Sequence, residues 1–200
     1  MTTKIIISDE EKALRKLVRN NGINISNMTD PSETVKLLAV KQNGHAIKFI
    51  ENPTMEMQLA AVHQNATSLE FIPEHTDELY FAALKSRNNA YYAAREFRNP
   101  SDAVLKQAFS QNSNTITFLQ NPTVQNKIMA LVCHAGSYPK VTAKTDAMRF
   151  EYIKEHPYSI DAVAKPTAEM CLWIIHNHPK YAREIRKPPT EEIKLLINLL

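Results

Sequence analysis

The chain repeats itself about every 22 residues, and this periodicity limits its fold more than any other feature. The clearest copies are DPSETVKLLAVKQNGHAIKFIE from Asp30, NPTMEMQLAAVHQNATSLEFIP from Asn52 and NPSDAVLKQAFSQNSNTITFLQ from Asn99. With weaker copies included, repeats start near residues 8, 30, 52, 74, 99, 121, 143 and 165, and a partial repeat starts near residue 188. Such regular steps of 22 to 25 residues indicate an array of equivalent structural units.

Each unit carries the sequence signals of a helix, a turn and a shorter second helix. The residue that opens the clearest units is expected to be an N-cap followed by proline at the first helical position, and these residues are Asp30, Asn52, Asn99 and Asn121. The first helices are expected over residues 9–20, 31–42, 53–64, 75–87, 100–111, 122–133, 144–155 and 166–177. The three additional residues of the 25-residue step are expected around Glu96–Arg98.

A unit of this size cannot bury its own apolar face, so stacked neighbours must supply the core. We therefore predict an all-α fold, a solenoid-like array of about eight 22-residue helix-turn-helix repeats that forms one domain over residues 1–200. The chain has only three glycines, which argues against the many tight turns of an all-β protein. The apolar run Ile193–Leu200 is expected either to pack on the array or to meet a partner.

Composition places the chain among ordinary globular proteins. Its net charge is only +3, and its two cysteines, Cys133 and Cys171, form no disulfide framework. No stretch approaches the roughly 20 apolar residues of a membrane span. The apolar run Ile5–Ile7 is too short for a signal peptide. These features predict a cytoplasmic protein.

The wording of the repeats, AVKQNG followed by AIKFIENPT and LAAVHQN, resembles a family of uncharacterised helical repeats. That family is known from bacteriophages, giant DNA viruses and some bacteria, and it is classed as a domain of unknown function. The resemblance is closest from Asp30 to Ile72 and weakens toward the C-terminus. It implies an α-helical repeat fold and a phage or viral origin, with the host cytoplasm as location. It implies no activity and no catalytic residues.

The histidines do not form a metal-binding pattern. His134, His156 and His178 lie 13 residues after their repeat starts, where Asn21, Asn43, Asn65 and Asn112 stand in other copies. We expect all of them to bond free carbonyls at the ends of first helices. Packed helices about 9–10 Å apart would hold the outer two histidines too far from each other to share a zinc ion. We predict no metal and no cofactor, with chance metal binding by a neighbouring pair as the alternative.

The sequence also lacks the motifs of common catalytic sites, such as a phosphate-binding glycine loop, GxSxG, HExxH or CxxC. Cys133 and His134 are adjacent and would point about 100° apart on a helix, which disfavours a nucleophile and base pair. We predict a non-enzymatic protein. An enzyme or small-ligand sensor is the third interpretation.

A basic edge supports nucleic-acid binding as the second interpretation. Cations recur eleven residues after several repeat starts, at Arg19, Lys41, Lys85 and Lys154. In a stacked array they would align at a spacing suited to a phosphate backbone. The series is interrupted at Ser110 and Val132 in the central repeats.

Protein binding is the first interpretation, because helical arrays present long faces whose side chains can vary freely. Tyrosine and arginine are common anchors of protein interfaces. The candidate partner-binding residues are Tyr80, Tyr91, Tyr92, Arg95, Arg98, Tyr158 and Tyr181. We predict an interaction protein that binds a host or viral protein, with interference in host defence or regulation as one role.

Overall fold

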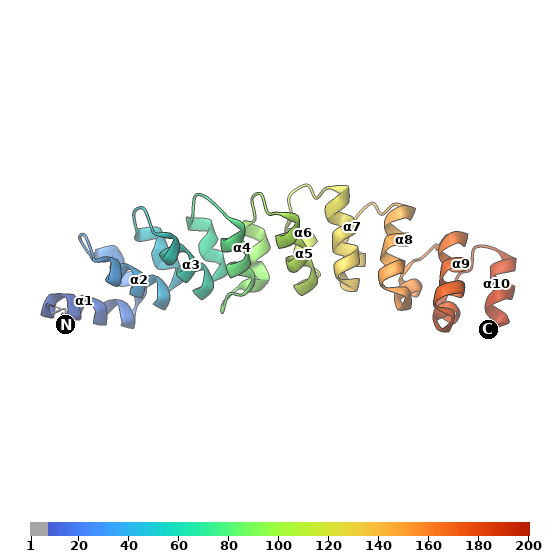
Figure 1. The fold of residues 1–200 in the computed structure, drawn as a ribbon, viewed down its shortest axis with the longest axis horizontal. Coiled ribbons are helices and arrows are strands. Elements are labelled where there is room, and N and C mark those ends of the chain that lie inside the picture. Colours follow the sequence, from blue (N-terminus) through green and yellow to red (C-terminus); the bar gives the residue numbers. More distant parts are fainter. Residues whose placement is uncertain (1–7) are drawn as a thin grey trace, which may run out of the picture. The chain divides into compact units, whose positions relative to one another are not determined.

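The computed structural model describes residues 8–200, and over this range it contains helices, turns and loops but no strand. The first helices of the repeats are α1 (Asp9–Asn20), α2 (Glu33–Gln42), α3 (Met55–Gln64), α4 (Asp77–Leu84), α5 (Asp102–Gln111), α7 (Val124–Cys133), α8 (Asp146–Glu155), α9 (Ala168–Asn177) and α10 (Glu191–Asn198). These helices are labelled on the ribbon in Figure 1. The predicted all-α repeat array is confirmed.

The second helices of the first eight repeats are 3₁₀ helices with one exception. They are η1 (Gly22–Asn27), η2 (Gly44–Phe49), η3 (Ala66–Phe71), η4 (Ala90–Glu96), η5 (Ala135–Lys140), η6 (Pro157–Ala162) and η7 (Pro179–Glu184), and the exception is α6 (Thr115–Phe118). A 3₁₀ helix gains about 2 Å per residue, so six residues span the same length as eight residues of α-helix.

Contacts divide the chain into two compact units, Met1–Val104 and Leu105–Leu200. In the first unit, α1 packs on α2, α2 on α3, and α3 on α4. In the second unit, α7 packs on α8, η6 on η7, and α9 on α10. The single domain expected over residues 1–200 stays a prediction, and the run Ile5–Ile7 lies outside the described residues.

The predicted N-caps are wrong. Asp30, Asn52 and Asn121 lie in the left-handed region, with φ of 47°, 48° and 52°, and most first helices begin two residues later than expected. Hydroxyl side chains form the caps instead by accepting hydrogen bonds from backbone N–H groups, and these caps are Ser32, Thr54, Thr76, Thr123, Thr145, Thr167 and Thr190. Ser101 Oγ accepts from Val104 N in the same way, so Asn99 is no cap either. Asp and Asn tolerate a left-handed backbone and serve here as the turn before proline.

The predicted position of the three additional residues is also wrong. Helix α4 ends at Leu84, three residues before the expected end, and the longer connection runs from Lys85 to Asn89. It covers the C-terminal end of α3, because Arg87 N donates to His63 O at 3.0 Å and Asn88 Nδ2 donates to Gln64 O at 2.8 Å. Asn89 then adopts a left-handed conformation, with φ of 60°, and leads into η4.

The core comes from five positions that recur along the array and are clearest in the second and third repeats. In the second repeat these positions hold Val35, Ala39, Val40, Ile47 and Ile50. The third repeat places Met57, Ala61, Val62, Leu69 and Ile72 in the same five positions, again buried. Burying a large aliphatic side chain contributes about 1.5–3 kcal/mol. The periodic core therefore explains why the repeats stack.

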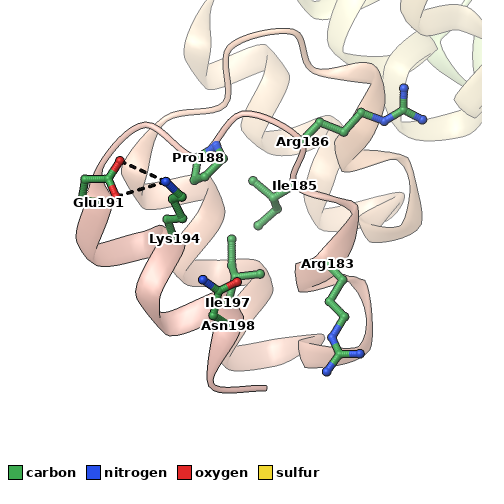
Figure 2. A pocket seen from close by; sticks show the side chains of 8 residues that line it. All are labelled: Arg183, Ile185, Arg186, Pro188, Glu191, Lys194, Ile197 and Asn198. Carbon is green, nitrogen blue, oxygen red and sulfur yellow. Dashed lines mark hydrogen bonds and ion pairs between the residues drawn. The ribbon is translucent and has the colours of Figure 1, made fainter.

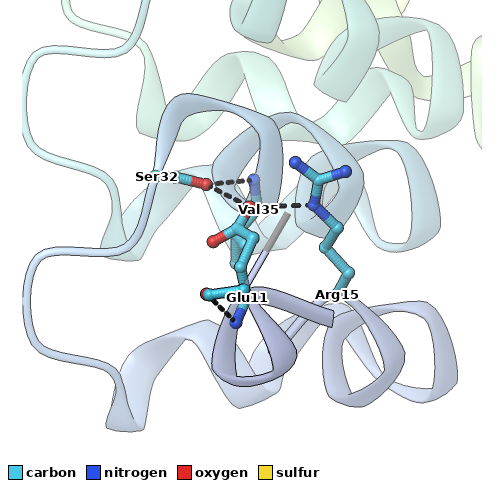
Figure 3. A network of polar contacts seen from close by, with 5 residues as sticks. Glu11, Arg15, Ser32 and Val35 are labelled. Carbon is cyan, nitrogen blue, oxygen red and sulfur yellow. Dashed lines mark hydrogen bonds and ion pairs between the residues drawn. The ribbon is translucent and has the colours of Figure 1, made fainter. Parts of the chain in front are cut away.

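A polar network joins the first two repeats (Figure 3). Ser32 Oγ accepts a hydrogen bond from Val35 N at 3.3 Å and donates to Glu11 Oε1 at 2.7 Å. Arg15 Nε donates to the same Glu11 oxygen at 2.8 Å. The hydrogen bonds from Ser32 and Arg15 lower the pKa of the Glu11 carboxyl group. The N-cap of α2 thus also links α2 to α1.

Candidate functional site

The exposed aromatic cluster of the first unit lies on η4 and consists of Tyr91, Tyr92 and Arg95. The two tyrosines are 47% and 40% exposed, and their rings meet edge to face with centroids 5.0 Å apart. The Arg95 guanidinium lies 4.7 Å from the centre of the Tyr92 ring. Residues three apart eclipse in a 3₁₀ helix, which explains why Arg95 reaches Tyr92. We call these three residues the η4 cluster.

Two of the predicted partner-binding residues, Tyr80 and Arg98, form contacts within the protein. Tyr80 is only 1% exposed, and its hydroxyl accepts a hydrogen bond from Arg98 N at 3.1 Å. The Tyr80 ring also packs on Phe97 at 4.5 Å between centroids. The Arg98 side chain is exposed but donates to Pro73 O at 2.8 Å. Burial removes Tyr80 from the partner-binding candidates, so that prediction is wrong.

Two further candidates, Tyr158 and Tyr181, lie on η6 and η7 of the second unit. Tyr158 is 53% exposed, whereas Tyr181 is half-buried. Their ring centroids are 6.4 Å apart, so successive repeats bring the two side chains together.

The residues of the predicted basic edge, Arg19, Lys41, Lys85 and Lys154, are all exposed. Two of them face carboxylates: Lys41 Nζ lies 3.8 Å from Glu56 Oε1, and Lys154 Nζ lies 2.9 Å from Glu151 Oε1. These intramolecular pairs reduce the positive charge that the edge presents.

A groove that the sequence analysis missed crosses α2, α3 and α4. Its volume is about 560 Å³, and it is lined by Lys41, Glu56, Leu59, Ala60, His63, Gln64, Ala82 and Arg87. Its apolar lining consists of Leu59, Ala60 and Ala82, which lie seven or eight residues after their repeat starts. All three side chains are only partly buried. The sequence signal was available, since these positions are apolar in the second, third and fourth repeats but do not fall on the core face.

The second unit has a larger groove of about 640 Å³ between η7 and α10 (Figure 2). Its lining includes Arg183, Arg186, Ile197 and the ion pair of Glu191 with Lys194, whose atoms are 3.3 Å apart. Ile197 aligns with Ala39, Ala61 and Ile174, which are fully buried in their own repeats. The lining is therefore partly made of core positions. In the C-terminal run, Ile193 packs internally, whereas Leu195, Leu196, Leu199 and Leu200 are exposed.

The Asn and His residues that follow the first helices do occupy equivalent positions, as predicted. Their chemistry differs from the expectation, because most accept a hydrogen bond instead of donating one to a carbonyl. The side chains of Asn43 and His134 accept from backbone N–H groups two residues ahead, at 3.0 and 3.1 Å. In the seventh and eighth repeats a proline follows the histidine, and in the seventh His156 Nε2 instead bonds Leu131 O at 3.0 Å. These residues are therefore caps of the second helices or bridges between repeats.

Potential metal ligands are not gathered in residues 8–200. Over that range no three His, Cys, Asp or Glu residues lie close enough to hold a metal ion. Burial raises the pKa of the Cys133 thiol, and it raises the pKa of Cys171 to about 11. A thiolate nucleophile is thus disfavoured at both positions. None of the helices in this range has the length and apolarity needed to cross a membrane.

No protein-family model, curated protein or solved structure matches the chain. The resemblance to viral and phage helical repeats stays a prediction that is based on the repeat wording alone.

Proposed function

We propose that this protein is a non-enzymatic helical-repeat protein that binds a protein partner through the η4 cluster. The observation that carries this proposal is the exposure of two tyrosine rings that contact each other, with an arginine over one of them. Tyr and Arg are enriched among the residues that dominate interface energetics. A tyrosine ring also offers a large contact area at low cost in conformational entropy.

The position of the cluster supports the same proposal. The η4 cluster follows the connection Lys85–Asn89, whose backbone is bonded to the end of α3. The cluster is therefore presented by a segment anchored to the preceding repeat. Preorganised anchors lose less entropy on binding than flexible ones.

If the viral resemblance holds, the partner is a host or viral protein, and interference with host defence or regulation is the proposed role. The alternative of nucleic-acid binding along Arg19, Lys41, Lys85 and Lys154 gains no specific support, because this series of cations is interrupted at Ser110 and Val132.

A peptide-display selection on the full chain tests this proposal. Selected peptides should bind the wild type and the Phe49→Ala variant equally but bind Tyr92→Ala at least about tenfold more weakly, the loss expected for an interface anchor. Phe49 is the matched control, since it is an aromatic residue on η2 that is 42% exposed and has Lys48 Nζ 4.8 Å from its ring centre. Peptides that bind Tyr91→Ala, Tyr92→Ala and Arg95→Ala as well as the wild type would overturn the proposal.

A further inference from the structure

The positive charge of the chain is concentrated in its second unit. Residues 105–200 contain twelve Lys and Arg against eight Asp and Glu, a net charge of +4, whereas residues 1–104 contain twelve against thirteen, a net charge of −1. A local excess of this kind attracts anionic partners to one part of a protein. The second unit is therefore the part of the chain where the net charge favours binding of an anionic ligand.

The same unit carries a continuous series of ring contacts between the last repeats. Tyr158 and Tyr181 lie 6.4 Å apart between centroids, and Tyr181 lies 6.3 Å from His178. His178 is 5.1 Å from Trp173, and His156 is 6.0 Å from Tyr158. Tyr158 is the most exposed of the tyrosines, at 53%. We call Tyr158, Tyr181 and their histidine neighbours the ring series.

Three cations lie on or just after η7, the 3₁₀ helix that carries Tyr181. Lys180 Nζ lies 4.7 Å from the centre of the Tyr181 ring. Arg183 follows Lys180 by three residues on η7, and residues at this spacing eclipse and lie about 6 Å apart along a 3₁₀ helix. Arg186 follows Arg183 by three residues in the sequence but lies beyond the end of η7 at Glu184. Figure 2 shows the Arg183 and Arg186 guanidinium groups pointing away from the Glu191–Lys194 pair.

Within residues 8–200, a single carboxylate, that of Asp161, is paired with one of the three cations Lys180, Arg183 and Arg186. Arg186 Nη2 lies 3.4 Å from Asp161 Oδ2, and the Arg186 side chain is 74% exposed. Exposed ion pairs contribute only about 0–1 kcal/mol, so this pair can exchange for a phosphate at little cost. Lys180 and Arg183 are exposed as well.

We infer that this surface of the second unit binds single-stranded nucleic acid, with bases stacked on Tyr158 and Tyr181 and phosphates bound by Lys180 and Arg183. Sequence-tolerant proteins of this kind combine aromatic rings that stack on bases with a basic track for the backbone. A duplex hides the faces of its bases, so it cannot use the exposed rings in the same way. The inference does not depend on the proposed protein partner, because the η4 cluster lies in the other unit.

Fluorescence anisotropy with a labelled 12-nucleotide single strand and the full chain tests this inference. Stacking contributes about 1–3 kcal/mol per base, so Tyr158→Ala and Tyr181→Ala should each weaken binding by about 5- to 150-fold. Tyr158→Phe, which keeps the ring, should bind like the wild type. The chain's one tryptophan, Trp173, adds a second readout, since its fluorescence should change when the strand occupies the neighbouring rings.

The salt dependence separates phosphate contacts from other effects. A double Lys180→Ala, Arg183→Ala variant should reduce the slope of log affinity against log salt by about 1.4, or 0.7 for each lost single-strand phosphate contact. Phe49→Ala, which removes an exposed aromatic ring of the first unit, serves as the control and should bind the strand unchanged. The inference is overturned if the strand fails to bind at about 50 mM salt, if duplex or polyglutamate competes equally well, or if the tyrosine variants bind like the wild type. Circular dichroism of each variant shows whether its helices are intact.

Discussion

The side-chain oxygen of Gln64 accepts a hydrogen bond from the backbone N–H of Gly44 at 2.6 Å, which joins the end of α3 to the turn of the preceding repeat. The same relationship recurs between Gln42 and Gly22, also at 2.6 Å. In the next repeat Ser86 replaces the glutamine, and Asn88 O accepts from Ala66 N at 3.0 Å instead. A backbone group of the longer connection thus replaces a side chain, and the paired glycine is no longer needed.

Gly44→Ala is expected to destabilise the first unit by about 1–3 kcal/mol, the usual range for overpacking. A Cβ at this position would clash with the Ala61 carbonyl oxygen, a backbone atom that cannot turn aside. Urea unfolding measures the loss, and Ala66→Gly at the equivalent position is the control, with an expected cost below about 1 kcal/mol. A Gly44→Ala protein as stable as the wild type would show that the repeats do not approach so closely.

Ser68→Ala is expected to leave stability unchanged or to raise it by about 1 kcal/mol, because an unpaired buried polar group is costly. Ser68 Oγ is fully buried and is the one such side-chain atom without a partner among residues 8–200. Ala46 occupies the equivalent position one repeat earlier. Thr115→Val provides the contrast, since it removes a hydrogen bond of 3.0 Å to Ala108 O and should destabilise. A marked loss of stability in Ser68→Ala would contradict this account.

Ser32→Ala is expected to cost more at pH 7 than Thr54→Ala, although both remove a helix cap with a typical value of about 1 kcal/mol. Ser32 also donates to Glu11, whose pKa is lowered by this bond and by Arg15. A lowered pKa gives stability that is complete above the usual carboxyl pKa and is lost as the pH falls through the lowered value. The difference between the two variants should therefore narrow in acid. Urea titrations at pH 7 and pH 3 measure the free energy of unfolding of both variants. If the difference between the variants is the same at both pH values, the Ser32–Glu11 hydrogen bond does not contribute to stability.

Cys133 and Cys171 are expected to react slowly with alkylating reagents at pH 8. Burial raises the pKa of both thiols, that of Cys171 to about 11, and only the thiolate is a good nucleophile. The alkylation rate should rise as the pH increases from 8 toward the raised pKa of each thiol. Unfolding in urea should make both cysteines react at the rate of a model thiol. Rapid labelling of either thiol in the folded protein at pH 7 would revive the enzyme interpretation.

The sequence predicted the repeat period and the ends of most first helices, because apolar spacing and turn residues report directly on local structure. It did not predict where the helices begin, since Asp30 and Ser32 are both good N-cap residues and only the backbone φ of 47° at Asp30 decides between them. Nor could it place the three additional residues. Their position depends on hydrogen bonds from Arg87 and Asn88 to α3, which join residues far apart in the sequence.

The candidate site was partly predictable for a similar reason. Tyrosine type alone could not separate Tyr80, which is 1% exposed, from Tyr91 and Tyr92, which are 47% and 40% exposed. Repeat alignment does not place Tyr91 and Tyr92, because they follow the longer connection Lys85–Asn89. The groove over α2–α4 is only partly predictable, because its apolar residues resemble core residues within a single repeat and only comparison between repeats separates the two sets. Contacts between repeats decide which apolar positions are covered.

The central claim is that the η4 cluster anchors a protein partner, and titration calorimetry with a selected peptide tests it most directly. The account predicts that Tyr91→Ala, Tyr92→Ala and Arg95→Ala each weaken binding, and that Tyr92→Ala costs at least about 1.4 kcal/mol, or tenfold. Phe49→Ala should bind with unchanged affinity. If the three cluster variants bind the peptide as tightly as the wild type does, the η4 cluster is not the partner-binding site.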